Sequence, residues 1–183
     1  DTESIIRLVD FLIENGVDYI VVHGTTGESS TLNKSEKNLS RTAFVNANKG
    51  RVPMILGLGS NDTLSIVNDL RSSQFSGFSA ILSVTPFYNK PSQNGLYKHY
   101  SAISKASPLP IILYNVPSRT GVNMLAKTTI EIASNHSNII GIKEACGDLN
   151  QVKQLIEKRP KDFMIISGDD DTAVKTVLLG GDG

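Results

Sequence analysis

A chain of 183 residues, 39% hydrophobic and 20% charged, is long enough for one domain with a substantial core. Its 18 basic and 18 acidic side chains cancel, so no broad positive field is available to bind nucleic acid or a membrane surface. No apolar run approaches the length of about 18 residues that a membrane-spanning helix requires.

Six short apolar runs rich in β-branched residues recur along the chain and predict buried parallel strands. They lie at residues 19–22, 54–56, 80–84, 111–114, 139–142 and 164–166. Because successive positions are apolar, both faces of each strand should be covered, as in parallel sheets. Seven segments with helical periodicity surround the strands, at residues 3–14, 34–48, 62–73, 93–105, 124–135, 149–158 and 171–179. This alternation indicates a repeated β-loop-α unit.

Polar residues at the ends of the predicted strands separate two architectures with this rhythm. An open doubly wound sheet that binds a dinucleotide carries Gly-x-Gly-x-x-Gly after its first strand, and that motif is missing here. Polar clusters instead follow nearly every strand, at Gly24-Thr25-Thr26, Gly57-Leu58-Gly59, Thr85-Pro86, Tyr114-Asn115, Lys143-Glu144 and Ser167-Gly168-Asp169. A (β/α)₈ TIM barrel collects all its strand ends around one mouth, so the distribution favours a barrel.

The count of six strands and seven helices is short of a complete barrel. The chain begins with a predicted helix and ends in the loop Gly180-Gly181-Asp182-Gly183. An open six-strand barrel would expose two long hydrophobic edges, which natural proteins avoid. We therefore expect residues 1–183 to be a single barrel domain, present as an incomplete fragment that lacks the first and last strands of a chain of about 250 residues.

Lys143 ends the apolar run Ile139-Ile140-Gly141-Ile142. A lysine is rarely buried without a partner, and burial lowers its pKa, which exposes a free amine at neutral pH. Such an amine can attack a ketone to form a Schiff base, an electron sink for carbanion chemistry. Two other interpretations stay open, namely an ion pair with Glu144 or a side chain that points to solvent.

Further candidates follow other strands. Tyr114 could shuttle protons beside an imine, and Arg119 in the next loop suits a bidentate grip on a carboxylate. Thr25 and Thr26, in a turn with free amides, could bind a carboxylate and pass a proton. Tyr88, in the loop after the third strand, could complete a hydroxyl relay. Each of these residues could instead serve packing, a turn or the surface.

Together these motifs resemble the dihydrodipicolinate synthase family of the pyruvate-dependent class I aldolases. The resemblance spans essentially the whole chain, and its five segments occur in order. They are Gly24-Thr25-Thr26-Gly27-Glu28-Ser29, Thr85-Pro86-Phe87-Tyr88-Asn89, Tyr114-Asn115-Val116-Pro117-Ser118-Arg119-Thr120-Gly121, Gly141-Ile142-Lys143-Glu144-Ala145 and Ser167-Gly168-Asp169-Asp170. Each segment alone is weak, but five in order are highly specific.

The resemblance implies a role for each candidate residue. Lys143 would form the imine with pyruvate, and Tyr114, Thr25 and Tyr88 would form the proton relay, the last across a tight dimer interface. The turn of Gly24 and Thr26 would bind the pyruvate carboxylate. Arg119 would receive the carboxylate of L-aspartate 4-semialdehyde.

The resemblance further implies a lyase that makes 4-hydroxy-tetrahydrodipicolinate, in the diaminopimelate route of lysine and amino-acid biosynthesis. The family is cytoplasmic, uses no cofactor or metal beyond the covalent pyruvate imine, and is usually a homotetramer, a dimer of dimers, with a C-terminal helical domain. One alternative is N-acetylneuraminate lyase or another keto-acid aldolase, which would need a polyhydroxyl acceptor site. A non-catalytic barrel and a metal-dependent aldolase are less consistent with the residues present.

The remaining candidates for chemistry favour structural roles. The three histidines, His23, His99 and His136, are too scattered for a metal set, and His23 is expected in the core. Asp169-Asp170-Asp171 is expected to cap a helix rather than bind a cation. Cys146 is expected to pack, and as a single cysteine it excludes an internal disulfide and is compatible with a reducing cytoplasm.

Feedback inhibition by lysine occurs in some family members, whose site typically carries an acidic residue and histidines. By alignment, Ser65 stands at the acidic position, Lys34 and Lys37 stand at two histidine positions, and Phe87 stands at a tyrosine position, while Asn61 is retained. Replacing a carboxylate by a hydroxyl removes the charge partner of an ammonium ligand. We therefore expect weak or absent inhibition by lysine.

Overall fold

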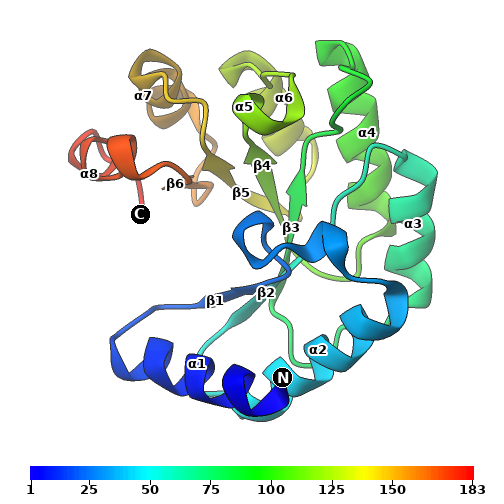
Figure 1. The fold of residues 1–183 in the computed structure, drawn as a ribbon. Helices are drawn as coiled ribbons and strands as arrows, with labels where there is room; N and C mark the ends of the chain where they lie inside the picture. The colour runs from blue at the N-terminus through cyan, green and yellow to red at the C-terminus, as the bar shows by residue number, and fades with distance from the viewer. The chain divides into compact units, whose positions relative to one another are not determined.

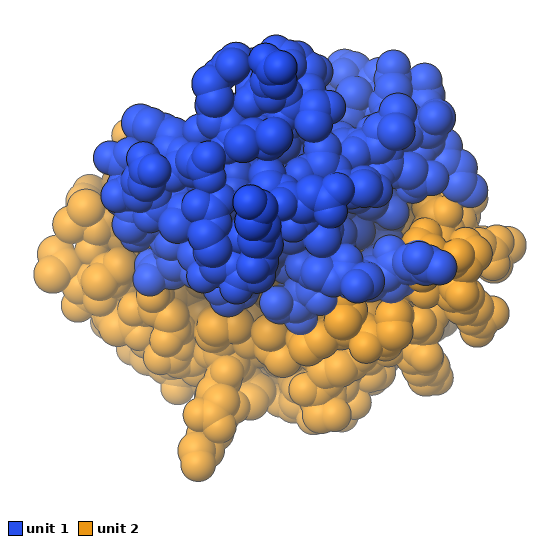
Figure 2. Space-filling model, turned by 90° about the horizontal axis from the view of Figure 1, so that it is seen from below, with its two compact units in different colours: residues 1–58, 74–82 blue, residues 59–73, 83–183 orange.

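Helices and strands alternate along the whole chain in the computed structural model, which describes all residues from 1 to 183 (Figure 1). The chain divides into two compact units, which are coloured separately in Figure 2. Unit 1 comprises residues 1–58 and 74–82, and unit 2 comprises residues 59–73 and 83–183. Strand β3 (Ala80–Val84) begins in unit 1 and ends in unit 2.

Unit 1 is built on parallel strands. Its elements are α1 (Thr2–Glu14), β1 (Ile20–Val22), the short 3₁₀ helices η1 (Thr25–Gly27) and η2 (Ser29–Thr31), α2 (Lys34–Asn48), β2 (Met54–Gly57) and the first residues of β3. β2 pairs with β1 on one side and with β3 on the other, and α1 packs against α2. Val22, Met54, Leu56 and Ile81 are at most 1% exposed, so the core lies along the three strands.

Capping side chains set where several helices begin. Asn33 precedes α2, and its side chain accepts from the backbone N–H of Glu36 at 3.0 Å while the Glu36 carboxylate accepts from the Asn33 N–H at 2.8 Å. This capping box satisfies two N–H groups that the first turn of a helix leaves unpaired. Asp169 accepts from the N–H of Asp171, so the prediction that the aspartate run caps a helix is confirmed.

Unit 2 contains the rest of the sheet and most of the helices. Its elements are α3 (Thr63–Ser72), the end of β3, α4 (Gln93–Ala106), β4 (Ile111–Asn115), α5 (Pro117–Thr120), α6 (Ala126–Asn135), β5 (Ile139–Glu144), α7 (Leu149–Lys158), β6 (Met164–Ser167) and α8 (Asp170–Leu178). β5 pairs in parallel with β4 and β6. Leu113, Ile142 and Ile165 in these strands are fully buried, and α6, α7 and α8 contact one another in succession.

The six predicted strands are all confirmed, and the seven predicted helices are present with their bounds shifted by at most two residues. The helix count was nevertheless wrong, because α5 makes eight α-helices. Four residues are too few to produce a periodic hydrophobic signal. Pro117 starts this turn at a position that needs no N–H, and Gly121 ends it in the left-handed region at φ +74°. None of the helices is both long enough and apolar enough to cross a membrane.

Candidate active site

Lys143 and Tyr114 lie opposite each other on neighbouring strands of unit 2. The register of β4 and β5 pairs Tyr114 with Lys143, and the next residues, Asn115 and Glu144, form the following pair. Nζ of Lys143 is 4.8 Å from the centre of the Tyr114 ring, and the tyrosine is 6% exposed. The structure therefore brings together the amine and the phenol that the sequence places at two separate strand ends.

The surroundings of Lys143 favour its uncharged form. The side chain is half-buried, and this burial lowers the pKa of the Lys143 amine. The face of the Tyr114 ring acts in the opposite direction, since a ring attracts an ammonium by roughly 0.5–1 kcal/mol at exposed sites. An amine with a lowered pKa is uncharged in a larger fraction near neutral pH and can attack a carbonyl carbon.

Gly168 makes room for the lysine side chain. A Cβ at this position would lie 2.7 Å from Cε and 3.0 Å from Cγ of Lys143, and 3.1 Å from Cβ of Ala145. These separations are shorter than van der Waals contact, so any larger residue would displace the lysine. The absence of a side chain at Gly168 is thus part of what places the amine.

Glu144, the residue that follows Lys143 in the sequence, is held by a buried network of hydrogen bonds. The carboxylate is 2% exposed and accepts from Asn115 Nδ2 at 2.9 Å, from Gln151 Nε2 at 3.0 Å and from the Cys146 backbone N–H at 2.9 Å. Burial raises the pKa of Glu144, and the hydrogen bonds to Gln151, Cys146 and Asn115 oppose that rise. The carboxylate that could have paired with Lys143 is therefore occupied by neutral donors.

This network includes two residues that were not predicted from the sequence, namely Gln151 and Asn123, whose Nδ2 donates to Gln151 Oε1 at 3.0 Å. A signal was available for Glu144, because a carboxylate that closes an apolar strand must find donors. Gln151 gave none, since one amide in an amphipathic helix is unremarkable in a sequence. It is 6% exposed on α7, beside the core residues Val152 and Leu155.

Arg119 and Tyr88 lie in two segments of unit 2 that are hydrogen-bonded to each other. Arg119 lies in α5 and is exposed, and Tyr88 is 87% exposed with φ +73°. The backbone N–H of Tyr88 donates to the carbonyl of Thr120 at 3.3 Å, and Asn89 Nδ2 donates to the carbonyl of Asn61 at 3.2 Å. The Tyr88 loop and α5 are thus tied through their backbones, and the side chains of Arg119 and Tyr88 are both exposed.

The turn of Gly24, Thr25 and Thr26 follows β1 in unit 1. Thr25 and Thr26 begin η1 and are exposed, and Gly24 precedes the helix in an extended conformation. His23 stands just before the turn with φ +61°. A Cβ at Gly57 would lie 2.2 Å from the His23 carbonyl oxygen, so the turn depends on a glycine in the neighbouring strand.

The histidines are each hydrogen-bonded to a hydroxyl group. The pairs are His23 Nε2 with Ser40 Oγ at 2.6 Å, His99 Nδ1 with Thr63 Oγ1 at 2.7 Å, and His136 Nε2 with Ser101 Oγ at 2.8 Å. Burial, reinforced by nearby positive charges, lowers the pKa of His23 to about 4, and burial lowers the pKa of His99 to about 4. No three His, Cys, Asp or Glu side chains gather as metal ligands would.

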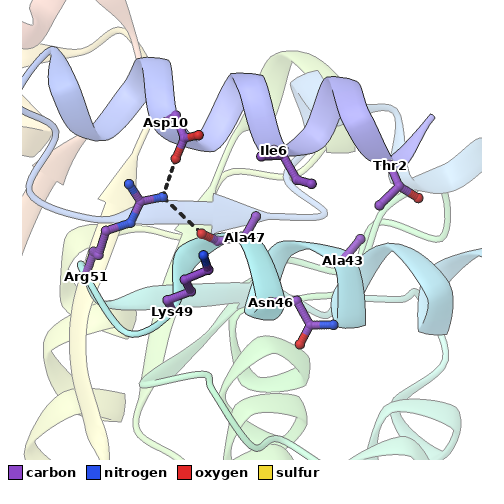
Figure 3. A pocket seen from close by; sticks show the side chains of 8 residues that line it. All are labelled: Thr2, Ile6, Asp10, Ala43, Asn46, Ala47, Lys49 and Arg51. Carbon is purple, nitrogen blue, oxygen red and sulfur yellow. Dashed lines mark hydrogen bonds and ion pairs between the residues drawn. The ribbon is translucent and has the colours of Figure 1, made fainter.

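A hollow of about 360 Å³ in unit 1 lies between α1 and α2 (Figure 3). Ile6 of α1 and Ala43 of α2 line it, and Arg51 donates to both Asp10 Oδ1 at 2.5 Å and the Ala47 carbonyl at 2.9 Å. Its arginine and its carboxylate are already paired with each other. None of the candidate residues lines this hollow, so it does not compete with the strand ends as a site of chemistry.

Comparison with known proteins identifies the family. The model of the dihydrodipicolinate synthetase family matches residues 1–183. The chain belongs to this family. A 4-hydroxy-tetrahydrodipicolinate synthase from Flavobacterium psychrophilum is 50% identical over 183 residues, which are 100% of this chain and 62% of that protein.

Solved structures of dihydrodipicolinate synthase have the same fold as this chain. The enzyme from Thermotoga maritima matches with a TM-score of 0.96 and 42% identity, over 100% of this chain and 63% of that one. The chloride-inhibited enzyme from Acinetobacter baumannii complexed with pyruvate matches with a TM-score of 0.94 and 44% identity, over 100% of this chain and 62% of that one.

The predicted fold class, a (β/α)₈ barrel present in part, is confirmed by these matches and by the six parallel strands. The chain spans 62% of the length of the Flavobacterium psychrophilum relative, to which it is 50% identical.

Replacing Gly168 by Ala tests the placement of the lysine. The new methyl group would overlap Lys143 and displace its amine, and a misplaced reacting group costs up to roughly 100-fold in rate. If Lys143 forms the imine that the family resemblance implies, we expect its rate of formation to fall by at least about tenfold. The measurement is reductive trapping of a keto acid on the complete protein.

Gly183→Ala is the matched control, because a Cβ there would meet Ile166 at an ordinary 3.7 Å. Equal trapping rates in the two variants would show that Gly168 does not place the lysine.

Proposed function

We propose that the complete protein is a 4-hydroxy-tetrahydrodipicolinate synthase, a lyase that condenses pyruvate with L-aspartate 4-semialdehyde through a Schiff base on Lys143. The observation that carries the proposal is the half-buried Lys143 amine, 4.8 Å from the buried ring of Tyr114, at the end of β5. Membership of the dihydrodipicolinate synthetase family and relatives named for this activity support it. The pathway would be diaminopimelate and lysine biosynthesis.

The proposed reaction begins with the uncharged amine of Lys143. The amine attacks the ketone carbon of pyruvate, water leaves, and a protonated imine forms. The imine withdraws electrons from the neighbouring methyl group, which loses a proton to give an enamine. The enamine carbon then attacks the aldehyde carbon of L-aspartate 4-semialdehyde. Finally the amino group of the product displaces Lys143 as the ring closes, which regenerates the free lysine.

The other candidate residues would move protons and hold carboxylates. Tyr114, with Thr25 and Tyr88, would carry protons to and from the imine nitrogen and the leaving water. Gly24 and Thr26 would bind the pyruvate carboxylate with backbone and hydroxyl groups of their turn. Arg119 would grip the carboxylate of the aldehyde. In this scheme the covalent imine serves as the electron sink, so the proposal requires no metal or separate cofactor.

Assembly and location follow from the same proposal. Tyr88 is 87% exposed, and Phe87 and Leu64 are 39% and 65% exposed in the same unit. A second subunit covering these apolar side chains would carry Tyr88 into its partner's site, which supports a tight dimer. The homotetramer, a dimer of such dimers, is proposed from the family resemblance alone. We further propose a cytoplasmic location and a single barrel domain to which residues 1–183 contribute.

Reductive trapping tests the nucleophile. Treating the complete protein with pyruvate and cyanoborohydride should leave one reduced adduct, on Lys143. Because burial lowers the pKa of Lys143, the uncharged amine is present at lower pH than for a free lysine. The trapping rate should therefore rise with pH and level off below the ordinary lysine pKa of about 10.4.

Lys143→Arg should abolish trapping, whereas Lys153→Arg on the exposed face of α7 should leave it unchanged. An adduct on any other lysine would overturn the mechanism.

Arg119→Ala separates the two substrates. Loss of a charge-assisted hydrogen bond should raise KM for L-aspartate 4-semialdehyde by roughly 10- to 100-fold. Trapping with pyruvate alone should not change, because Arg119 is assigned to the second substrate. Steady-state kinetics of the complete protein measures both quantities, with Arg71→Ala at the exposed end of α3 as the control. A polyhydroxyl acceptor used in preference to the semialdehyde would point to an N-acetylneuraminate lyase instead.

Inhibition by lysine should be weak in the complete protein. Ser65 is exposed on α3 and carries no charge to pair with an ammonium ligand. Activity measured against increasing lysine should stay near its starting value, and Ser65→Glu should lower the concentration needed for inhibition. Strong inhibition of the unsubstituted protein at sub-millimolar lysine would contradict this expectation.

A further inference from the structure

We propose that Glu144 is a positioning residue for the Lys143–Tyr114 pair, and that it acts through Asn115 and Gln151 without touching substrate. The inference rests on the proposed function, because it gives the network the task of holding an imine-forming lysine. It concerns groups that the proposed reaction does not use.

The carboxylate of Glu144 is an acceptor shared by three parts of unit 2. Asn115 Nδ2, at the end of β4, donates to both oxygens at 2.9 and 3.2 Å. Gln151 Nε2, on α7, donates to Oε2 at 3.0 Å, and the backbone N–H of Cys146, in the turn after β5, donates to Oε1 at 2.9 Å. One buried group therefore joins two strand ends and the helix that follows them.

A second layer of contacts extends the network to the segment between α5 and α6. Asn115 Oδ1 accepts from the backbone N–H of Met124 at 3.0 Å, and Gln151 Nε2 donates to the Met124 carbonyl at 3.0 Å. Asn123 donates through Nδ2 to Gln151 Oε1 at 3.0 Å and accepts through Oδ1 from Asn115 Nδ2 at 2.7 Å. The segment that follows the Arg119 turn is thus fixed to the same carboxylate.

The donors to Glu144 are neutral groups. A buried carboxylate is costly unless it is hydrogen-bonded, and a neighbouring ammonium would be the usual partner. If Lys143 served as that partner, the ion pair would hold the amine in its protonated, unreactive form. Asn115, Gln151 and Cys146 satisfy the carboxylate instead, so Glu144 does not need the Lys143 ammonium as a partner.

Strand geometry converts this network into a constraint on the lysine. Successive side chains of a strand point to opposite faces, so Glu144 and Asn115 lie on the face toward α7 while Lys143 and Tyr114 lie on the other. The Asn115–Glu144 hydrogen bonds connect the residue pair directly after Tyr114–Lys143 in the ladder. Holding one pair in register therefore holds the other, and sets how deeply the amine is buried.

Glu144→Gln is the direct test in the complete protein. The substitution keeps the shape of the side chain but turns an N–H₂ group toward two of the three donor residues, Asn115 and either Gln151 or Cys146, so the pair should lose its alignment. Gln151→Met is a milder second variant that removes one donor and keeps the carboxylate. Glu157→Gln is the matched control. Glu157 is exposed on α7, the helix that carries Gln151, and pairs with Lys153 alone at 3.8 Å.

The trapping rate and the kinetic constants decide between the two roles. They are normalised to the concentration of folded protein and measured well below the unfolding temperature of each variant. Glu144→Gln should lower the rate of pyruvate trapping and kcat by at least about tenfold with a smaller change in KM. The pH at which trapping reaches half its maximum should also rise, because a displaced lysine is less buried. Gln151→Met should shift both quantities in the same direction by less.

A purely structural network gives a different result. It predicts that both variants lose thermal stability, yet trap pyruvate at the rate and pH midpoint of Glu157→Gln once folded. That outcome overturns the proposal, and if Glu144→Gln does not fold, Gln151→Met is judged by the same criterion. If the unsubstituted protein itself gives no adduct on Lys143, the proposed function fails. Normal trapping in every variant refutes the positioning role alone.

Discussion

The pairing of β4 with β5 is the constraint on which the chemistry of unit 2 depends. Its register places Tyr114 opposite Lys143 and, one residue further, Asn115 opposite Glu144. Because side chains alternate between the two faces of a strand, a slip by one residue would exchange these faces completely. The amine would then point toward α7 and the carboxylate toward the opposite face.

The two charged residues that end β5 are adjacent in sequence but have separate surroundings. Burial lowers the pKa of Lys143, and burial raises the pKa of Glu144 against its hydrogen bonds. An ion pair between them would relieve both burial costs and would leave the lysine protonated. The amides of Asn115 and Gln151 remove the need for that pair. The cost of burying Glu144 is thus met on one face of the sheet, and the other face carries the amine of Lys143, the proposed nucleophile.

The sequence predicted the strands and the lysine–tyrosine pair for one physical reason. Runs that are apolar on both faces are typical of parallel strands, so a polar residue that ends such a run, like Lys143 or Tyr114, stands out. Gln151 could not be predicted, because its role depends on which helix packs beside Glu144, and that is settled by tertiary packing. The short helix α5 was missed because four residues carry no period.

The candidate residues also differ in how far the structure supports their proposed roles. Lys143 and Tyr114 are in contact. Tyr88 is placed by its backbone, which has φ +73° and whose N–H donates a hydrogen bond to the carbonyl of Thr120. A positive φ is uncommon for an aromatic residue, and such strain persists where the surrounding structure enforces it. Here the enforced conformation leaves the ring 87% exposed. The proposed assembly gives this strained turn a purpose, because a partner subunit would cover the exposed ring. The proposed relay therefore depends on the proposed assembly, because Tyr88 would reach an imine across that surface.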